Sequence, residues 1–237
     1  MATFLIAHGA WSGGWAWKKM RAPLAERGHV LLTPTYTGLG ERSHLANPSI
    51  DLETHIADIL AVLEFENLED VVLVAHSYGG MVATGVLDRA GARIGEVIYL
   101  DAFVPKEGHS LFDYQSGEAC EQMRELARIQ GDGWAIPPGP LAPGVAPDDV
   151  EWLAARRRPQ PLKTFEQKLA LGATAPDLPR SYIYCRKKAP GDVFVQFAEA
   201  VRQSPAWRYY EIDSGHIPNV TMPKTLAALL DEMVTGG

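Results

Sequence analysis

Ser77 is the residue of this chain whose position best suits nucleophilic chemistry. It lies in VVLVAHSYGGM (71–81), where an apolar run ends and a helical pattern begins. A strained turn at such a junction lifts the serine Oγ above a sheet and requires small residues two positions away, which Ala75 and Gly79 supply. An ordinary turn with an incidental serine is the alternative, but the strand before and the helix after favour a nucleophile elbow.

A nucleophilic serine needs an imidazole that removes its proton, because its hydroxyl is a poor nucleophile at neutral pH. Among the seven histidines, His216 in EIDSGHIPN (211–219) has the right position, after the last predicted strand. We interpret His8 as a structural residue of the loop after the first strand. The sequence therefore predicts that His216 is the general base.

The negatively charged oxygen of a tetrahedral intermediate needs backbone N–H donors. One donor is expected from Tyr78, the residue after the nucleophile, and the other from the loop after the first strand. That loop reads HGAWSGGW (8–15), in which Gly9 permits a close approach of the backbone and Ala10 can offer its N–H. The pattern predicts an oxyanion hole made by Ala10 and Tyr78.

Strand and helix patterns alternate along most of the chain. Apolar runs predict strands at 3–8, 30–35, 71–76, 96–103, 181–185 and 207–212, and helical patterns lie at 15–28, 51–67, after Ser77 up to Gly91, at 192–203 and at 223–234. The runs are nearly continuous, as in a parallel sheet that is covered on both faces. They predict an α/β fold with a doubly wound, mostly parallel sheet of about six strands.

Residues 103–180 interrupt this alternation. They contain helical patterns near 116–130, 147–156 and 163–171, no convincing strand, and the Pro/Gly-rich segment WAIPPGPLAPGVAPDD (134–149). A segment this long inside a compact domain is usually functional. We predict an inserted helical cap, or lid, on a core of 1–102 and 181–237 within a single overall domain, and we expect the cap to cover Ser77.

Composition excludes several other classes of protein. A net charge of −7 argues against nucleic-acid and anionic membrane partners, and RRR (156–158) is interpreted as a solvated helix end. Cys120 and Cys185 form no zinc or disulfide pattern, so no metal and no cofactor is expected. The start of the chain has no leader pattern, which predicts a cytoplasmic protein. The oligomeric state is left open, with a homodimer as one alternative.

With nucleophile, oxyanion loop and base in this order, the chain resembles the α/β-hydrolases. More narrowly, it resembles the plant methylesterase and hydroxynitrile lyase group and its bacterial esterase relatives. The likeness rests on AHGAWSGGWAWKKMRAPLAERGH (7–29), VVLVAHSYGGM (71–81), VIYLDAFVP (97–105) and the GH at 215–216. It implies a serine esterase that cleaves a small hydrophobic or aromatic ester, or a carbamate, through an acyl-enzyme.

The same resemblance distinguishes esterases from lyases at two positions. The lyases carry a threonine after the first-strand histidine and a lysine after the catalytic histidine, where this chain has Gly9 and Ile217. Esterase activity is therefore favoured. Lyase or other C–C bond chemistry on the same scaffold is an alternative. A non-catalytic binder of a small ligand is another, although Ser77 and His216 argue against it.

The acid that orients His216 is left open between two aspartates. Where the plant relatives place this acid, the chain has Lys187 or Lys188, and Asp192 follows four or five residues later. The resemblance to α/β-hydrolases also allows a second location for the acid, at the end of the strand that follows the nucleophile helix. Asp101 occupies that position, and we favour it because a strand end holds a carboxylate more firmly than a flexible basic stretch.

Substrate specificity is weakly encoded. The candidate pocket residues are Gly9, Trp11, Phe103, Phe112, Trp134, Trp152, Phe165 and Ile217. We expect roughly half of them to pack in the core or the cap instead, because apolar side chains are usually buried.

Overall fold

The structure is a computed structural model that describes residues 1–141, 144–172, 177–188 and 191–236. Six parallel strands form its main sheet: β1 (Thr3–Ala7), β2 (Val30–Leu32), β3 (Val71–His76), β4 (Ile94–Leu100), β7 (Arg180–Cys185) and β8 (Arg208–Ile212). Their order in the sheet is β2-β1-β3-β4-β7-β8. The predicted doubly wound α/β sheet is confirmed.

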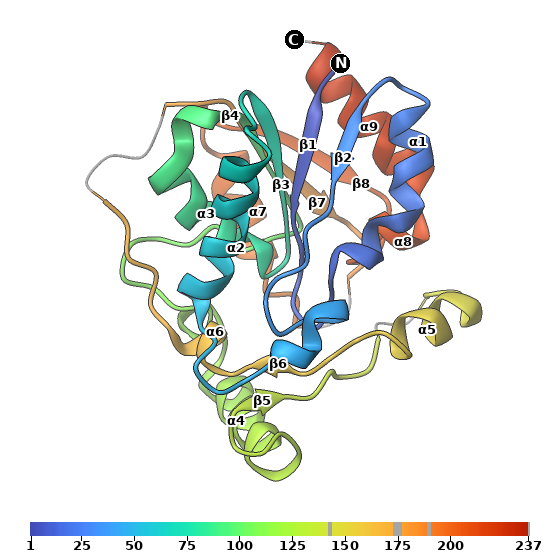
Figure 1. The fold of residues 1–237 in the computed structure, drawn as a ribbon. Helices are drawn as coiled ribbons and strands as arrows, with labels where there is room; N and C mark the ends of the chain where they lie inside the picture. The colour runs from blue at the N-terminus through green and yellow to red at the C-terminus, as the bar shows by residue number, and fades with distance from the viewer. Residues whose placement is uncertain (142–143, 173–176, 189–190, 237) are drawn as a thin grey trace.

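Helices cover both faces of this sheet (Figure 1). One face carries η1 (Gly14–Met20), α1 (Arg21–Ala25), α8 (Pro218–Thr221) and α9 (Pro223–Thr235), and the other carries α2 (Leu52–Phe65), α3 (Gly79–Ala90) and α7 (Val195–Arg202). Side chains of strand β1 pack on both faces of the sheet. Phe4 and Ile6 belong to one hydrophobic cluster, and Leu5 and Ala7 belong to the other. This alternation explains why the strands read as continuous apolar runs.

The start of α2 follows directly from its sequence. The Asp51 carboxylate accepts the Thr54 backbone N–H at 3.0 Å, and the Thr54 hydroxyl accepts the Asp51 backbone N–H at 3.4 Å. These two bonds form a capping box, which satisfies N–H groups that the first helical turn leaves unpaired. The short turns η2 (Gly40–Leu45) and η3 (Gly91–Arg93) lie in connections of the core.

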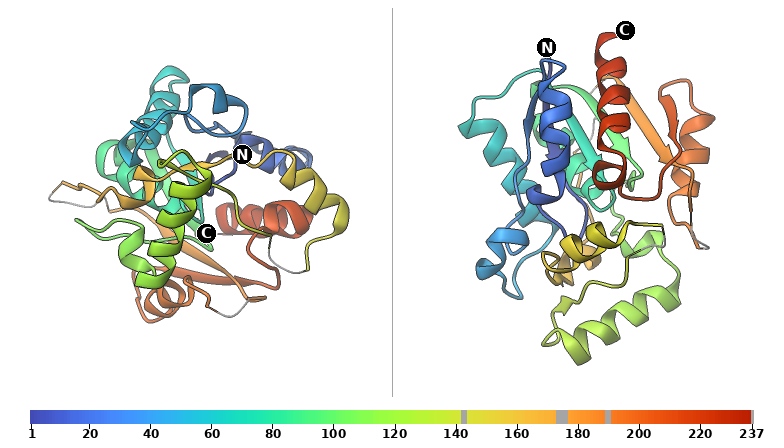
Figure 2. Two further views of the ribbon diagram at one scale, coloured as in Figure 1. Left: turned by 90° about the horizontal axis from the view of Figure 1, so that it is seen from below. Right: turned by 90° about the vertical axis from the view of Figure 1, so that its right-hand side faces the viewer.

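The segment between β4 and β7 lies beneath the carboxyl ends of the parallel strands (Figures 1 and 2). It contains η4 (Phe112–Tyr114), α4 (Gly117–Gln130), β5 (Ala135–Ile136), α5 (Pro147–Ala154), β6 (Gln160–Pro161) and α6 (Lys163–Glu166). The prediction of no strand here was wrong, because β5 and β6 form an antiparallel pair. Two residues per strand are too few to produce an alternating pattern. The third predicted helix is also shorter than expected and ends at Glu166.

No helix in the described part of the chain is long and apolar enough to cross a membrane.

Candidate active site

Ser77 occupies a sharp turn between β3 and α3. Its φ of 56° lies in the left-handed region, where a non-glycine residue is strained. Gly79 is required two residues later, because a Cβ there would lie 2.0 Å from the carbonyl oxygen of Ala7. Ser77 lines a cavity at the carboxyl end of the sheet. The local sequence therefore builds a strained turn that presents a serine to a cavity.

His216, in the loop after β8, lines the same cavity and meets Asp101. Its Nδ1 donates a hydrogen bond of 2.6 Å to Asp101 Oδ2. Asp101 directly follows β4, is fully buried, and has a φ of 45°. Because Nδ1 carries the proton and donates it as a hydrogen bond to the carboxylate, the other ring nitrogen, Nε2, is left as a proton acceptor.

A lysine also binds the Asp101 carboxylate. Lys188 Nζ is 2.6 Å from each oxygen of Asp101, and the Cys185 backbone N–H donates to Oδ1 at 3.3 Å. Burial raises the pKa of Asp101, but the hydrogen bond and charge of His216, together with Lys188, outweigh burial and hold that pKa below its ordinary value. Asp101 is therefore an ionised, fully buried partner of His216.

In the described part of the chain, Asp192, the alternative acid, forms no hydrogen bond or ion pair with His216. It accepts the Tyr184 hydroxyl at 2.8 Å and the Phe194 backbone N–H at 3.1 Å, and it lies 3.3 Å from Lys188 Nζ. Lys188 thus bridges Asp101 and Asp192. The structure therefore pairs His216 with Asp101. Asp192 is connected to Asp101 through Lys188.

Two rings that the sequence reasoning did not single out hold His216 in place. His76 Nε2 donates to the His216 carbonyl oxygen at 2.7 Å, and its ring lies 4.8 Å from that of His216. Phe194 stacks on the His216 ring, with a centroid distance of 4.9 Å and an interplanar angle of 14°. His76 could have been noticed, because it precedes Ser77 in the elbow. Nothing in the local sequence distinguishes Phe194.

The two expected oxyanion donors lie around the same turn. Within the described residues, neither the Ala10 nor the Tyr78 backbone N–H has an acceptor, and Ala10 lines the cavity. The Tyr78 side chain is directed away from the cavity and donates to His55 Nδ1 at 2.9 Å.

Ser77 Oγ forms no hydrogen bond with any described residue. Such contacts are often long without substrate and tighten when it binds.

Three buried histidines are kept neutral around this site. His8 donates from Nδ1 to Gly9 O at 2.8 Å and accepts the Tyr36 N–H at 3.2 Å. These bonds hold the loop after β1, as expected for a structural residue. Desolvation by burial lowers the pKa of His8 and of His55 to about 4, and that of His76 to about 3. All three are therefore uncharged at neutral pH.

We expect the protein to lose stability as the pH falls from 6.5 to 4. In the unfolded chain these histidines titrate near 6.5, so below that pH the unfolded state binds protons that the folded state does not. Each buried histidine should lower the free energy of unfolding by up to about 1.4 kcal/mol per pH unit in that window. Urea unfolding between pH 7.5 and 4.5 measures this slope.

His55→Gln should make that slope shallower, because one of the three titrating groups is gone. His44 is exposed, so His44→Gln should leave the slope unchanged. A free energy of unfolding that stays constant from pH 6.5 to 4.5 would contradict the assignment of these histidines as buried neutral groups.

The cavity that holds Ser77 and His216 has a volume of about 1090 Å³. Three of the predicted pocket residues line it: Gly9, Trp11 and Ile217. The segment between β4 and β7 contributes further lining residues, namely Pro140, Leu141, Gly144, Val145, Leu153 and Arg157. That segment therefore forms one wall of the cavity.

The other five predicted pocket residues do not line this cavity among the described residues, and the prediction for them is corrected. Phe103 packs against Phe194 and Phe197, and Phe112 packs against Phe165. Phe165 also supports Trp11 from behind, at 5.6 Å between ring centroids. Trp152 packs behind Trp15 at 5.1 Å, and Trp134 is half-buried beside β5. These rings support the cavity wall or fill the core.

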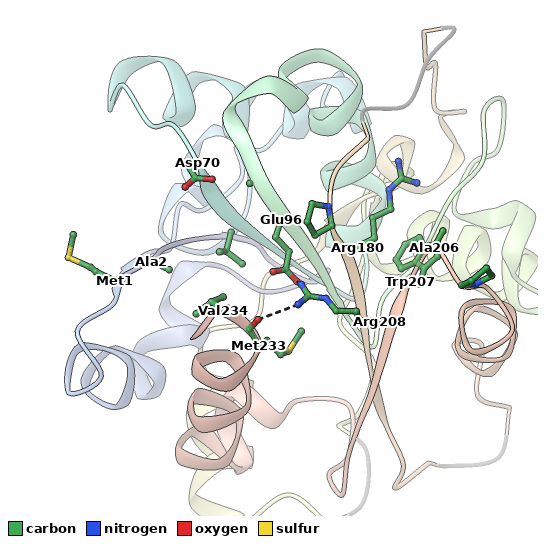
Figure 3. Close-up of a pocket in the computed structure, with 14 residues that line it drawn as sticks. Met1, Ala2, Asp70, Glu96, Arg180, Ala206, Trp207, Arg208, Met233 and Val234 are labelled. Atoms are coloured by element: carbon green, nitrogen blue, oxygen red, sulfur yellow. Dashed lines mark hydrogen bonds and ion pairs between the residues drawn. The ribbon is translucent and has the colours of Figure 1, made fainter. Parts of the chain in front are cut away.

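A second hollow, of about 640 Å³, lies at the opposite, amino end of the strands (Figure 3). Its central charges are paired: Arg208 forms an ion pair with Glu96, and Ser181 donates to Glu96 at 2.8 Å. Neither Ser77 nor His216 lines it. We therefore place the candidate site in the larger cavity. Among the described residues, no group of three or more His, Cys, Asp or Glu side chains could hold a metal ion.

Comparison with known proteins finds relatives over nearly the whole chain. A model of the alpha/beta hydrolase family matches residues 4–229. A carbendazim hydrolyzing esterase of Nocardioides sp. (strain SG-4G) is 39% identical, covering 97% of this chain and 98% of its own. Methylesterase 9 of Arabidopsis thaliana is 26% identical over 95% of each chain. The predicted resemblance to plant methylesterases and bacterial esterases is confirmed.

A solved structure shares the fold over nearly the whole chain. It is an extracellular alpha/beta-hydrolase from a Paenibacillus species, with a TM-score of 0.85, 23% identity, and coverage of 97% of this chain and 98% of that one. The family match over residues 4–229 and the relative at 39% identity together establish the family of this chain. The chain belongs to the alpha/beta hydrolase family.

Proposed function

We propose that this protein is a serine carboxylesterase that cleaves small hydrophobic or aromatic esters, or carbamates, through an acyl-enzyme. The observation that carries the proposal is the hydrogen bond of 2.6 Å between His216 and the buried Asp101, in the cavity that Ser77 also lines. A nucleophile, a base and an orienting carboxylate are the parts that ester cleavage by a serine requires.

In the first half of the reaction, Ser77 Oγ attacks the carbonyl carbon of the ester while His216 Nε2 takes the hydroxyl proton. The carbonyl oxygen becomes an oxyanion, to which the N–H groups of Ala10 and Tyr78 donate. Removing one such donor typically raises the activation barrier by about 3–4 kcal/mol. The C–O bond to the alcohol then breaks, and His216 gives its proton to the leaving oxygen.

In the second half, water enters and His216 takes one of its protons. The resulting hydroxide attacks the acyl-enzyme, and the same two N–H groups stabilise the second oxyanion. The bond to Ser77 Oγ breaks, the proton returns to that oxygen, and a carboxylic acid leaves. Asp101 keeps its charge throughout, since its role is to orient the imidazole and stabilise its cationic form.

The substrate class rests on the cavity wall and on the relatives. Apolar side chains of the wall include Trp11, Leu141 and Leu153, which suit a hydrophobic or aromatic group. The carbendazim hydrolyzing esterase, at 39% identity, motivates the inclusion of carbamates. We propose that residues 103–180 act as a lid that selects substrates, since they supply part of this wall.

A panel of small substrates tests the function. Aryl acetates, methyl benzoate, a methyl aryl carbamate and mandelonitrile cover ester, carbamate and cyanohydrin chemistry. We expect hydrolysis of the esters and no release of cyanide from the cyanohydrin, because no lysine follows His216. Cyanide release without ester hydrolysis would indicate the lyase alternative. Binding without turnover of any compound would indicate a non-catalytic binder.

A further inference from the structure

Arg157 is not the solvated helix-end residue that its place in RRR (156–158) predicts. Its side chain is half-buried and lines the cavity of Ser77 and His216. Arg156 and Arg158, its neighbours in the run, are exposed. The interpretation of the whole run as a solvated helix end was wrong for Arg157, because the chain leaves α5 just before it and passes along the cavity wall.

The guanidinium of Arg157 has no carboxylate partner within 4 Å among the described residues. Burial lowers the pKa of this group, and no nearby acid opposes that effect. Removing a cation from water is unfavourable unless an opposite charge or hydrogen bonds compensate. Arg157 is therefore a partly desolvated cation whose compensation by the described chain is incomplete.

The other cations of the cavity lining are paired. Lys187 Nζ lies 3.3 Å from Asp213, and Arg186 lies 3.4 Å from the same residue. Lys188 pairs with Asp101. These three side chains have carboxylate partners on the protein, whereas Arg157 has none among the described residues. The contrast makes Arg157 the lining cation most suited to meet a charge on a ligand.

The position of Arg157 is fixed by contacts to neighbouring segments. One of its terminal nitrogens, Nη1, donates to the Gly139 carbonyl at 2.5 Å, and the guanidinium lies 5.8 Å from the ring centroid of Trp11. The chain is tied to the oxyanion loop by a bond of 3.4 Å from the Arg158 N–H to the Trp11 carbonyl, and by one of 3.0 Å from the Trp11 N–H to Gln160. Since Trp11 follows the proposed oxyanion donor Ala10, Arg157 is anchored to the loop that carries this donor.

We propose that Arg157 binds a carboxylate on the substrate, so that the enzyme prefers esters of molecules that also carry a negative charge. This inference rests on the proposed esterase function and specifies its substrate. A guanidinium presents its N–H groups in a planar fork that matches a carboxylate, and the charged hydrogen bonds strengthen in a partly desolvated site. The Trp11 ring supports the guanidinium and offers an apolar surface to the rest of the substrate.

Matched pairs of esters that differ in charge and little in shape test this proposal. Monomethyl terephthalate and methyl 4-carbamoylbenzoate place the carboxylate or its neutral amide on the acyl side. The pair 4-acetoxybenzoate and 4-acetoxybenzamide places it on the leaving alcohol. We expect kcat/KM for the anionic member of at least one pair to exceed that of the neutral member by about tenfold or more.

The decisive reading is the ratio of anionic to neutral kcat/KM within each variant, which cancels any loss of active protein. Arg157→Gln should reduce the ratio to about one. Arg157→Lys should retain part of it, because it keeps the charge but not the fork. Arg158→Gln, a control in the same run, should keep the wild-type ratio.

Failure of this inference can be distinguished from failure of the esterase function. Equal kcat/KM within both pairs, or a ratio that Arg157→Gln leaves unchanged, would overturn the role of Arg157 while ester hydrolysis stands. If no compound is hydrolysed, calorimetry of Ser77→Ala with monomethyl terephthalate and its amide analogue decides binding alone. Tighter binding of the anion, by about tenfold and dependent on Arg157, supports the subsite, and equal binding overturns it.

Discussion

Ser77→Ala should lower kcat/KM for every ester that the protein cleaves by at least about 10⁴-fold, and its melting temperature should stay close to that of the wild type. The nucleophilic oxygen is lost, so no acyl-enzyme can form. The fold should tolerate the change, since the Ser77 side chain makes no hydrogen bond with any described residue. Alanine also keeps a Cβ at the strained turn. Initial rates and thermal unfolding, measured on the same samples, check both parts.

Ser12→Ala is the matched control for this loss. Ser12 lines the same cavity but has no role in the proposed mechanism, so its removal should change kcat/KM by less than about tenfold. Ser77→Ala activity within tenfold of the wild type would contradict the assignment of Ser77 as the nucleophile.

Asp101→Asn should lower the rate by roughly 10²–10⁴, whereas Asp192→Asn should lower it by less than about tenfold. Asp101 accepts the hydrogen bond from His216 Nδ1, at 2.6 Å. An amide at that position can donate to Nδ1 and favour the wrong tautomer of the imidazole. Asp192 is linked to Asp101 through Lys188 and to His216 through Phe194, with no hydrogen bond or ion pair to either among the described residues. Its loss should therefore lower the rate only slightly. Steady-state kinetics of the two variants give the ranking.

Lys188 complicates the comparison, and a double variant separates its effect. Asp101→Asn leaves the Lys188 ammonium with Asp192 as its remaining carboxylate, which should cost stability as well as rate. Asp101→Asn combined with Lys188→Met removes that charge. It should recover part of the lost melting temperature but none of the lost rate. Recovery of the rate, or a larger loss in Asp192→Asn than in Asp101→Asn, would contradict the pairing of His216 with Asp101.

The fold could be predicted because its strands and helices have strong local patterns. The four central strands β1, β3, β4 and β7 are mostly buried and therefore read as apolar runs, whereas the edge strands β2 and β8 are partly exposed. The Asp51 cap begins α2 where the sequence indicates. The pair β5 and β6 could not be predicted in this way. Its strands have two residues each, and their pairing depends on how distant parts of the segment meet.

The candidate site was predictable where chain order and turn geometry determine position. The positions of Ser77 and His216 could be predicted because each residue follows a recognisable strand, β3 and β8 respectively. The acid was left open because the chain supplies two aspartates, and only the folded structure shows that His216 meets Asp101. Lys188 lies between the two aspartates, a contact that sequence spacing cannot reveal.

The lining of the cavity was the least predictable part. Phe112 and Phe165 are apolar in the same way as Trp11, but they are buried behind it or in the core, and sequence alone does not say which side of a wall a ring occupies. The sequence analysis did not identify Arg157 as a cavity residue. In sequence it is one of three similar arginines, and only its position along the cavity distinguishes it from Arg156 and Arg158.

Covalent labelling with a fluorophosphonate tests the central claim most directly, because such reagents trap an activated serine without depending on substrate preference. The protein should take up one phosphonyl group per chain, and peptide mass mapping should locate it on Ser77. Ser77→Ala should take up none, and His216→Ala should react far more slowly, since the base is gone. If the wild type hydrolyses esters but takes up no label, or carries the label on a residue other than Ser77, the proposed acyl-enzyme mechanism is contradicted.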